Sequence, residues 1–232
     1  ENIAKKYKIS RKEQDEYALH SHKKAIAARN AGKFKEEIIP VEIKNGEKGT
    51  IQFLTDEQPR DNTSLEALQK LSPVFKKDGT VTAGNASSLN DAAAMTLVAS
   101  EEFVKQHNLK PMAKVITFAS IGLDPNLMGL GAYYAAEKCL SKTKLKPSNI
   151  DLWEINEAFA SQSIAVQRLL KIEPGKLNVN GGALALGHPI GASGARILTT
   201  LLHELKRQSK QYGMATLCIG GGQGIAMIVE NL

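Results

Sequence analysis

The organisation of this 232-residue chain follows from residues 181–196, Gly-Gly-Ala-Leu-Ala-Leu-Gly-His-Pro-Ile-Gly-Ala-Ser-Gly-Ala-Arg. This stretch surrounds one imidazole, that of His188, with five glycines. Glycine has no Cβ and accepts positive φ, so backbone and ligand can come close to the ring, while Pro189 fixes φ beside it. Leucines at helical spacing follow, at 198, 201, 202 and 205. The stretch therefore predicts a histidine in a loop that enters a helix N-terminus, where free N–H groups favour negative charge.

Two further polar or glycine-rich segments stand where short apolar runs end. Asn156-Glu157-Ala158-Phe159-Ala160 follows the run 152–155, and Cys218 closes the run 214–217 before Ile-Gly-Gly-Gly-Gln-Gly at 219–224. Short apolar runs bounded by turn residues are typical of strands. Each segment is therefore predicted to sit at the end of a strand, in a chain that alternates strand and helix patterns after Pro111.

These three segments, in this order, resemble the signature segments of the thiolase family, in particular its acetyl-CoA acetyltransferases. The resemblance extends to residues 80–87, Thr-Val-Thr-Ala-Gly-Asn-Ala-Ser, and to Arg60, and so covers in effect the whole chain. It implies an α/β fold with layered α/β/α/β/α architecture, of which the N-terminal part is missing here. It also implies the interconversion of two acetyl-CoA with acetoacetyl-CoA and CoA. A coenzyme A thioester is then the substrate, and we expect neither a cofactor nor a metal.

The chemistry of such a reaction needs a proton removed beside a thioester and an enolate stabilised. We expect the amides of the 220–224 turn to favour the thiolate of Cys218, with the Gly220 amide in an oxyanion site. His188 can take a proton from a thiol or donate a hydrogen bond to a thioester oxygen. Asn156 does not titrate, so its expected role is to hold a water or a carbonyl. These assignments agree with the catalytic roles that the resemblance implies.

The resemblance also implies a set of residues that contact the coenzyme A thioester. These are Arg60 near the nucleotide, Phe75 at the pantetheine entry, Ser87 at the pantetheine arm, Met128 in the acyl pocket, and Ala158 and Phe159. Taken alone, Arg60 reads as a surface arginine, Ser87 as a helix-start residue and Met128 as a loop residue packed on the core. Met128 favours short-chain substrates, and a broad-specificity 3-ketoacyl-CoA thiolase is the alternative.

Three regions are predicted along the chain. By the resemblance, residues 1–89 form a loop region that covers coenzyme A, 90–110 a helix and connection belonging to the N-terminal thiolase domain, and 111–232 the C-terminal domain.

Local patterns add detail. Ser10 begins a capped helix that Gly32 closes, strands lie near 38–43 and 51–54 around the turn Asn45-Gly46, and a short helix begins near Ser64. Residues 81–87 are predicted to be a short strand that enters a Gly-Asn-Ala-Ser turn, and a helix over 88–106 follows. Residues 225–229 are expected to return antiparallel, which makes the sheet mixed.

The main departure from the family concerns the acyl-carrying nucleophile. Thiolases use a second cysteine for this role, in an upstream half that these residues do not contain. The only other cysteine is Cys139, which lies in a helical pattern without a glycine loop or adjacent base. We therefore expect a buried structural thiol at Cys139, and we expect these residues alone not to run the acyl-transfer cycle.

Composition narrows the remaining classes. The net charge is +6, but basic and acidic residues are interleaved without aromatic platforms, which argues against nucleic acid as a partner. No long apolar run predicts a membrane helix, and two distant cysteines suit a reducing compartment, so we expect a cytoplasmic protein.

The resemblance implies a homodimer or homotetramer. A non-catalytic acyl-CoA-binding subunit stays open, and a nucleotide-binding protein is disfavoured because no phosphate-loop motif occurs.

Overall fold

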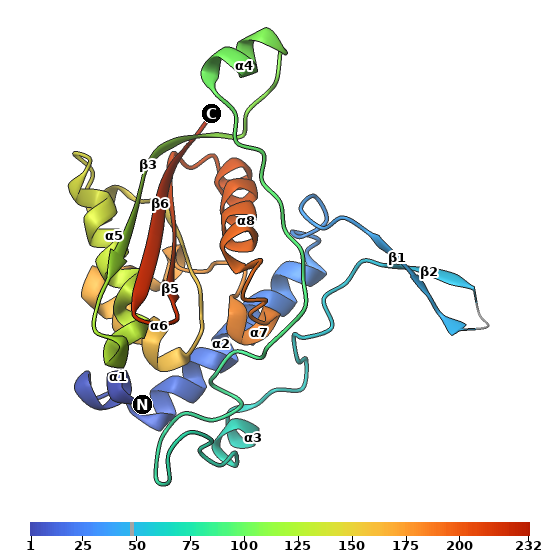
Figure 1. The fold of residues 1–232 in the computed structure, drawn as a ribbon. Helices are drawn as coiled ribbons and strands as arrows, with labels where there is room; N and C mark the ends of the chain where they lie inside the picture. Colours follow the sequence, from blue (N-terminus) through green and yellow to red (C-terminus); the bar gives the residue numbers. More distant parts are fainter. Residues whose placement is uncertain (47–48) are drawn as a thin grey trace.

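The apolar runs predicted as strands form one mixed four-stranded sheet in a computed structural model that describes residues 1–46 and 49–232 (Figure 1). Its strands are β3 (Ala113–Gly122), β4 (Leu152–Ile155), β5 (Tyr212–Ile219) and β6 (Gln223–Asn231), in the order β3-β6-β5-β4. β6 runs antiparallel to β3 and β5, whereas β4 runs parallel to β5, with Ile155 opposite Thr216. The predicted return of 225–229 as an antiparallel neighbour is confirmed.

Helices cover both faces of this sheet. α5 (Gly131–Ser141) and α6 (Ala160–Leu170) pack on one face, around the fully buried Trp153 and Met214. α8 (Ser193–Gln208) packs on the other face through Ile197, Leu201 and Leu205. Those last two are members of the leucine pattern that predicts this helix. In Figure 1 the sheet stands between α5 and α8, so the described residues supply one α/β/α set of layers of the expected architecture.

The N-terminal region lies below this sheet in Figure 1. α1 (Asn2–Lys6) leads to α2 (Arg11–Asn30), whose N-terminus is closed by the predicted capping box between Ser10 and Glu13. α2 packs on α6 and on α7 (Ala183–Leu186). α3 (Leu65–Gln69) begins, as predicted, after the N-cap Ser64. Short 3₁₀ helices lie between the longer elements, at η2 (Pro125–Leu130), η3 (Pro147–Asn149) and η4 (Pro174–Lys176).

A hairpin of β1 (Val41–Lys44) and β2 (Thr50–Phe53) extends away from the body (Figure 1). All eight of its strand residues are exposed. It confirms the two strands predicted near 38–43 and 51–54, although both ends of each strand lie one to three residues away from the predicted positions. The predicted turn begins at Asn45 and Gly46, but its continuation through 47–48 lies outside the described residues.

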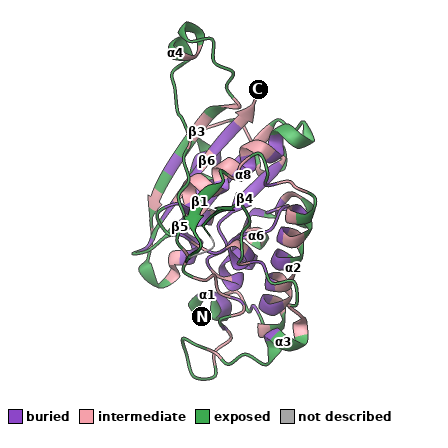
Figure 2. Cartoon of the chain, turned by 90° about the vertical axis from the view of Figure 1, so that its right-hand side faces the viewer, coloured by how far each residue is buried: buried purple, intermediate pink, exposed green. Residues whose placement is uncertain are grey.

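Two predictions in the middle of the chain are wrong. The helix expected over 88–106 forms only at α4 (Glu101–Gln106), and residues 91–100 have no regular structure. The apolar side chains of that stretch are exposed, with Met95 at 89% and Leu97 at 82%, and Figure 2 shows α4 and its approach standing apart from the body. A helix of this length depends on packing of its apolar face, and no described residue covers this one.

The short strand expected from residue 81 is also wrong, whereas the turn expected after it is present, at 83–85. Thr82 makes an isolated bridge with Pro73, and Ala86 makes one with Phe159, around a turn at 83–85. Asn85 explains the turn, because its side chain accepts from the Thr82 amide and donates to the Thr80 carbonyl and to Asp15. An amide that bonds its own backbone competes with a ladder.

No helix in the described part of the chain is long and apolar enough to cross a membrane.

The close approach of α5 and β6 gives a stability prediction. A Cβ placed on Gly224 would lie 2.1 Å from the Gly131 carbonyl oxygen, which is backbone and cannot move aside cheaply. We expect Gly224→Ala to lower the melting temperature by about 5 °C, as overpacking of about 1–3 kcal/mol implies for a domain of this size. Gly175→Ala, at a position with open space, is the control. Equal melting temperatures for the two variants in a thermal scan would contradict the packing argument.

Candidate active site

His188 is presented by a short turn that ends in a left-handed glycine. α7 closes on Gly187, whose φ of +87° is a conformation that residues with a Cβ rarely adopt. A Cβ there would also lie 2.1 Å from the Asn90 side chain. The His188 amide then donates to the Ser88 carbonyl at 3.0 Å. The glycine loop predicted from the sequence therefore fixes the imidazole between the 88–90 segment and the start of α8.

The hydrogen bonds around the ring define its tautomer. His188 Nδ1 lies 2.6 Å from Ser193 Oγ, and Ser193 Oγ donates its own proton to the Pro189 carbonyl at 2.9 Å. Ser193 therefore accepts from His188, which places the ring proton on Nδ1. The Nε2 lone pair is left free to act as a base.

Asn156 lies at the end of β4, against the face of the His188 ring. Its Nδ2 is 3.3 Å from Nε2 and 3.5 Å from Nδ1, nearly the same distance from both ring nitrogens, so it covers the ring and does not lie along the Nε2 lone pair. The backbone amide of Asn156 donates to the Thr216 carbonyl of β5 at 3.0 Å. Its Oδ1 is buried without a hydrogen-bond partner among the described residues. A buried amide oxygen without a partner is costly, so this atom is well suited to accept from a water or a substrate group.

Electrostatics keep the imidazole neutral. Burial lowers the pKa of His188, and the positive charge of Arg196 lowers it further. A ring whose pKa lies below its ordinary value is a free base at neutral pH. The arrangement can therefore receive a proton at Nε2.

Cys218 lies at the same edge of the sheet as Asn156. Both follow the register pair of Ile155 with Thr216, and parallel strands bring their carboxyl ends together. Cys218 is 6% exposed, and burial raises the pKa of its thiol to about 11.

The expectation that the glycine turn favours the Cys218 thiolate is not met. Among the described residues no amide of the 220–224 turn donates to the sulfur, and desolvation outweighs the stabilising contact with the cysteine's own backbone. Gly220, two residues after Cys218, is exposed. The role of its amide in an oxyanion site stays a prediction.

Three of the residues predicted to bind the thioester line one cavity of about 430 Å³. They are Phe75, Met128 and Phe159. The rings of Phe75 and Phe159 pack edge to face, with their centroids 5.9 Å apart. Ser87 and Ala158 lie beside them, because the Ser87 amide and hydroxyl both donate to the Ala158 carbonyl at 3.0 Å. Apolar walls with few polar groups are typical of small-molecule sites.

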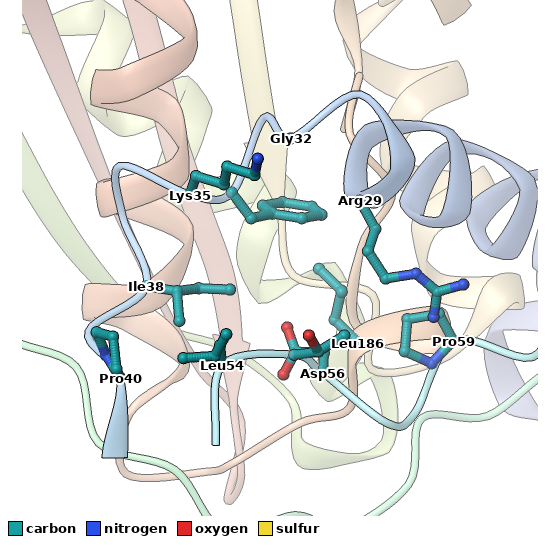
Figure 3. A pocket seen from close by; sticks show the side chains of 11 residues that line it. Arg29, Gly32, Lys35, Ile38, Pro40, Leu54, Asp56, Pro59 and Leu186 are labelled. Atoms are coloured by element: carbon teal, nitrogen blue, oxygen red, sulfur yellow. The ribbon is translucent and has the colours of Figure 1, made fainter. Parts of the chain in front are cut away.

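Arg60 is not brought to this cavity. Its backbone amide donates to His22 Nδ1 at 3.1 Å, and its side chain is not among the lining groups. A second cavity of about 300 Å³ lies between the end of α2 and residues 54–59, which directly precede Arg60 (Figure 3). It holds none of the predicted site residues.

Several structural partners of the site escape sequence reasoning. Ser193, which fixes the His188 tautomer, lies five residues beyond the histidine within the same glycine-rich stretch, and that spacing is its only signal. Glu157 and Asn178 form a buried polar cluster behind the site. Glu157 lies in the quoted Asn-Glu-Ala-Phe-Ala segment, but nothing in the sequence around Asn178 singles it out.

Comparisons with known proteins agree with this geometry. The family model described as "Thiolase, N-terminal domain" matches residues 1–102, and "Thiolase, C-terminal domain" matches residues 109–231. Acetyl-CoA acetyltransferases from Syntrophomonas wolfei and Allochromatium vinosum are 56% and 51% identical over this whole chain, which spans 59% of each. This chain belongs to the thiolase family.

Solved structures show the same fold. The acetyl-CoA acetyltransferase of Bacillus anthracis matches with a TM-score of 0.97 at 46% identity, over all of this chain and 58% of that one. The human mitochondrial 3-ketoacyl-CoA thiolase in complex with CoA matches with a TM-score of 0.91 at 47% identity, over all of this chain and 57% of that one. The chain thus spans less than two thirds of the relatives that it matches.

The raised pKa of Cys218 predicts its reactivity. At pH 8 a thiol with a pKa of about 11 is thiolate in about one molecule per thousand, whereas an ordinary cysteine with a pKa near 8.5 is about one quarter thiolate. We expect iodoacetamide to alkylate Cys218 on the order of a hundredfold more slowly than a free cysteine, with a rate that still rises at pH 10. Peptide mass spectrometry of the 232-residue chain measures this, with Cys218→Ser as control. A rate that levels off near pH 8 would contradict it.

Proposed function

We propose that the protein to which these residues belong is an acetyl-CoA C-acetyltransferase, which interconverts two acetyl-CoA with acetoacetyl-CoA and CoA. The observation that carries this proposal is the neutral His188, whose Nδ1–H is held by Ser193 and whose ring is covered on one face by the Asn156 amide. A base in this form can take the proton from a thiol, which is the step that activates a sulfur nucleophile. The matching relatives that are named acetyl-CoA acetyltransferases support the assignment.

Cys218 supplies the second proton in this proposal. In the cleavage direction, the thiolate of the acyl-carrying cysteine attacks the ketone carbon, the carbon–carbon bond breaks, and the electron pair left on the departing acetyl-CoA takes a proton. The thiol of CoA then gives up its proton and takes the acyl group, which frees the cysteine. A thiol with a pKa of about 11 is protonated at neutral pH and can donate that proton. In condensation the same sulfur, as thiolate, is a strong base for the methyl group of acetyl-CoA.

The acyl-carrying nucleophile is a different group. Cys139 is fully buried, and its Sγ lies 3.6 Å from the Thr117 carbonyl and 3.8 Å from the Ala226 carbonyl, in the core between α5 and the sheet. Burial also raises its pKa. This burial supports the structural role predicted for Cys139 from the sequence. We propose that the nucleophilic cysteine lies in a part of the protein outside these residues and that this chain alone is inactive.

Substrate and assembly extend the proposal. Phe75, Met128 and Phe159 would hold the acyl and pantetheine groups, with Ser87 and Ala158 alongside and Arg60 toward the nucleotide. The cycle as proposed needs no cofactor beyond the thioester. We further propose a homodimeric or homotetrameric cytoplasmic protein. The similarity to human mitochondrial 3-ketoacyl-CoA thiolase supports a second candidate function, the cleavage of longer 3-ketoacyl-CoA chains.

The first functional test uses the full-length product of the gene. We expect it to exchange acetyl-CoA with acetoacetyl-CoA, and we expect His188→Ala and Cys218→Ala each to lower kcat by about 10²–10⁴, as loss of an acid or base group does. His203→Ala and Cys139→Ala, at positions outside the site, are matched controls that should keep near-normal rates.

Two other outcomes would change this conclusion. Saturable CoA binding without exchange would replace the enzyme with a binding subunit. Turnover by the 232-residue chain alone would show that one of its own groups carries the acyl chain.

Chain-length preference is tested at Met128. We expect Met128→Ala to enlarge the acyl end of the cavity and to raise kcat/KM for a 3-ketohexanoyl-CoA relative to acetoacetyl-CoA by about tenfold, since removed side-chain volume discriminates substrates by about 1–3 kcal/mol. Met95→Ala, at a side chain 89% exposed, is the control. An unchanged ratio would place the acyl group elsewhere.

A further inference from the structure

Glu157 stands directly after Asn156 in the chain but points away from the site, into the protein. It is 1% exposed, and its carboxylate accepts three hydrogen bonds. Asn178 Nδ2 donates to Oε1 at 2.8 Å, while Ser21 Oγ and the Leu184 amide donate to Oε2 at 2.6 Å and 3.2 Å. One buried side chain therefore joins α2, α7 and the segment after η4.

Each of these partners is itself fixed to backbone. Asn178 accepts from the Ile155 amide at 2.8 Å and donates to the Ile155 carbonyl at 2.9 Å, so it is locked to the last residue of β4. Ser21 Oγ accepts from the Gly182 amide at 3.0 Å. The carboxylate is thus tied on one side to the strand that carries Asn156 and on the other to the turn that carries His188.

The packing leaves no room for another arrangement. A Cβ on Gly182 would lie 2.2 Å from the Glu157 carboxyl carbon, and one on Gly181 would lie 2.7 Å from the Ser21 carbonyl oxygen. The Leu184 amide is one of the unpaired donors in the first turn of α7, which Glu157 satisfies in place of a local capping residue. α7 then runs through Gly187 directly into His188.

We propose that Glu157 is a positioning residue, which sets the distance between the Asn156 amide and the His188 ring by holding the end of β4 and the start of α7 to one carboxylate. The inference rests on the proposed roles of Asn156 and His188. Glu157 touches neither ring nor substrate and acts only through these two side chains.

Substitution by glutamine isolates the effect, because it keeps the volume and replaces one acceptor with a donor. Asn178 cannot turn its amide, since both of its ends bond to Ile155, and the Leu184 amide can only donate. The new NH₂ group must therefore face a donor on one side. We expect Glu157→Gln to loosen the clamp and to open the gap between Asn156 and His188.

The readout is the chemical modification of His188 by diethyl pyrocarbonate in the full-length protein, followed by peptide mass spectrometry. The reagent acylates the free nitrogen of a neutral imidazole, so its rate reports how closely the Asn156 amide is held over the His188 ring and does not require enzymatic activity. Loss of exchange activity in the parent protein would therefore overturn the proposed function without affecting this test.

We expect Asn156→Ala to raise the modification rate of His188 several-fold and Glu157→Gln to raise it by a similar factor. The double variant should show no further increase, because both changes remove the same contact. Asp151→Asn is the matched control: this carboxylate accepts from the amides of Gln211 and Tyr212 at the opposite end of β4, and its loss should leave the rate unchanged.

A wild-type rate in Glu157→Gln would overturn the proposal. So would rates that multiply in the double variant, since these would show general loosening without a shared contact. Should Glu157→Gln fail to fold, Ser21→Ala decides the matter: it removes one donor to the carboxylate and the acceptor of the Gly182 amide, and a rate equal to that of the wild type would also overturn the proposal.

Discussion

The parallel pairing of β4 with β5 is the constraint on which the rest of the site depends. It aligns Ile155 with Thr216, so β4 ends beside the last residues of β5, and Asn156 and Cys218 lie at the same end of the sheet. The pairing is held from outside as well, because the Asn178 side chain bonds both backbone groups of Ile155 and the Asn156 amide continues the ladder to Thr216. A strand of only four residues thereby gains a fixed end, which a reacting centre requires.

The polar groups buried behind this end of the sheet are energetically unfavourable. Glu154 is buried in β4, where burial raises its pKa to about 8, and its nearest cation is the Arg196 guanidinium at 4.0 Å. Both groups have a buried atom without a partner among the described residues. Leaving such atoms unpaired is unfavourable. Burial lowers the pKa of His188, and the same Arg196 charge lowers it further, so the cation that is poorly paired in the core also helps to keep this imidazole neutral.

The positions of candidate site residues could be predicted from the sequence wherever a local backbone requirement shows in consecutive residues. Glycines around His188, the end of an apolar run at Asn156 and at Cys218, and the capping box at Ser10 each express a local backbone requirement, and the structure confirms their positions. Prediction from the sequence failed where the outcome depends on distant partners. Residues 91–100 have helical composition but no surface to pack on, and Asn85 overrides a strand pattern through bonds to Thr82, Thr80 and Asp15. The state of the Cys218 thiol likewise depends on how deeply the fold buries it, which no spacing encodes.

Burial of Cys218 also bears on oxidative damage. Peroxides react with thiolates, and the ladder from sulfenic to sulfonic acid begins only where the thiolate is populated and accessible. Cys218 is 6% exposed and its thiol has a pKa of about 11, so it meets neither condition. Holding this thiol in its protonated form therefore protects it from irreversible oxidation.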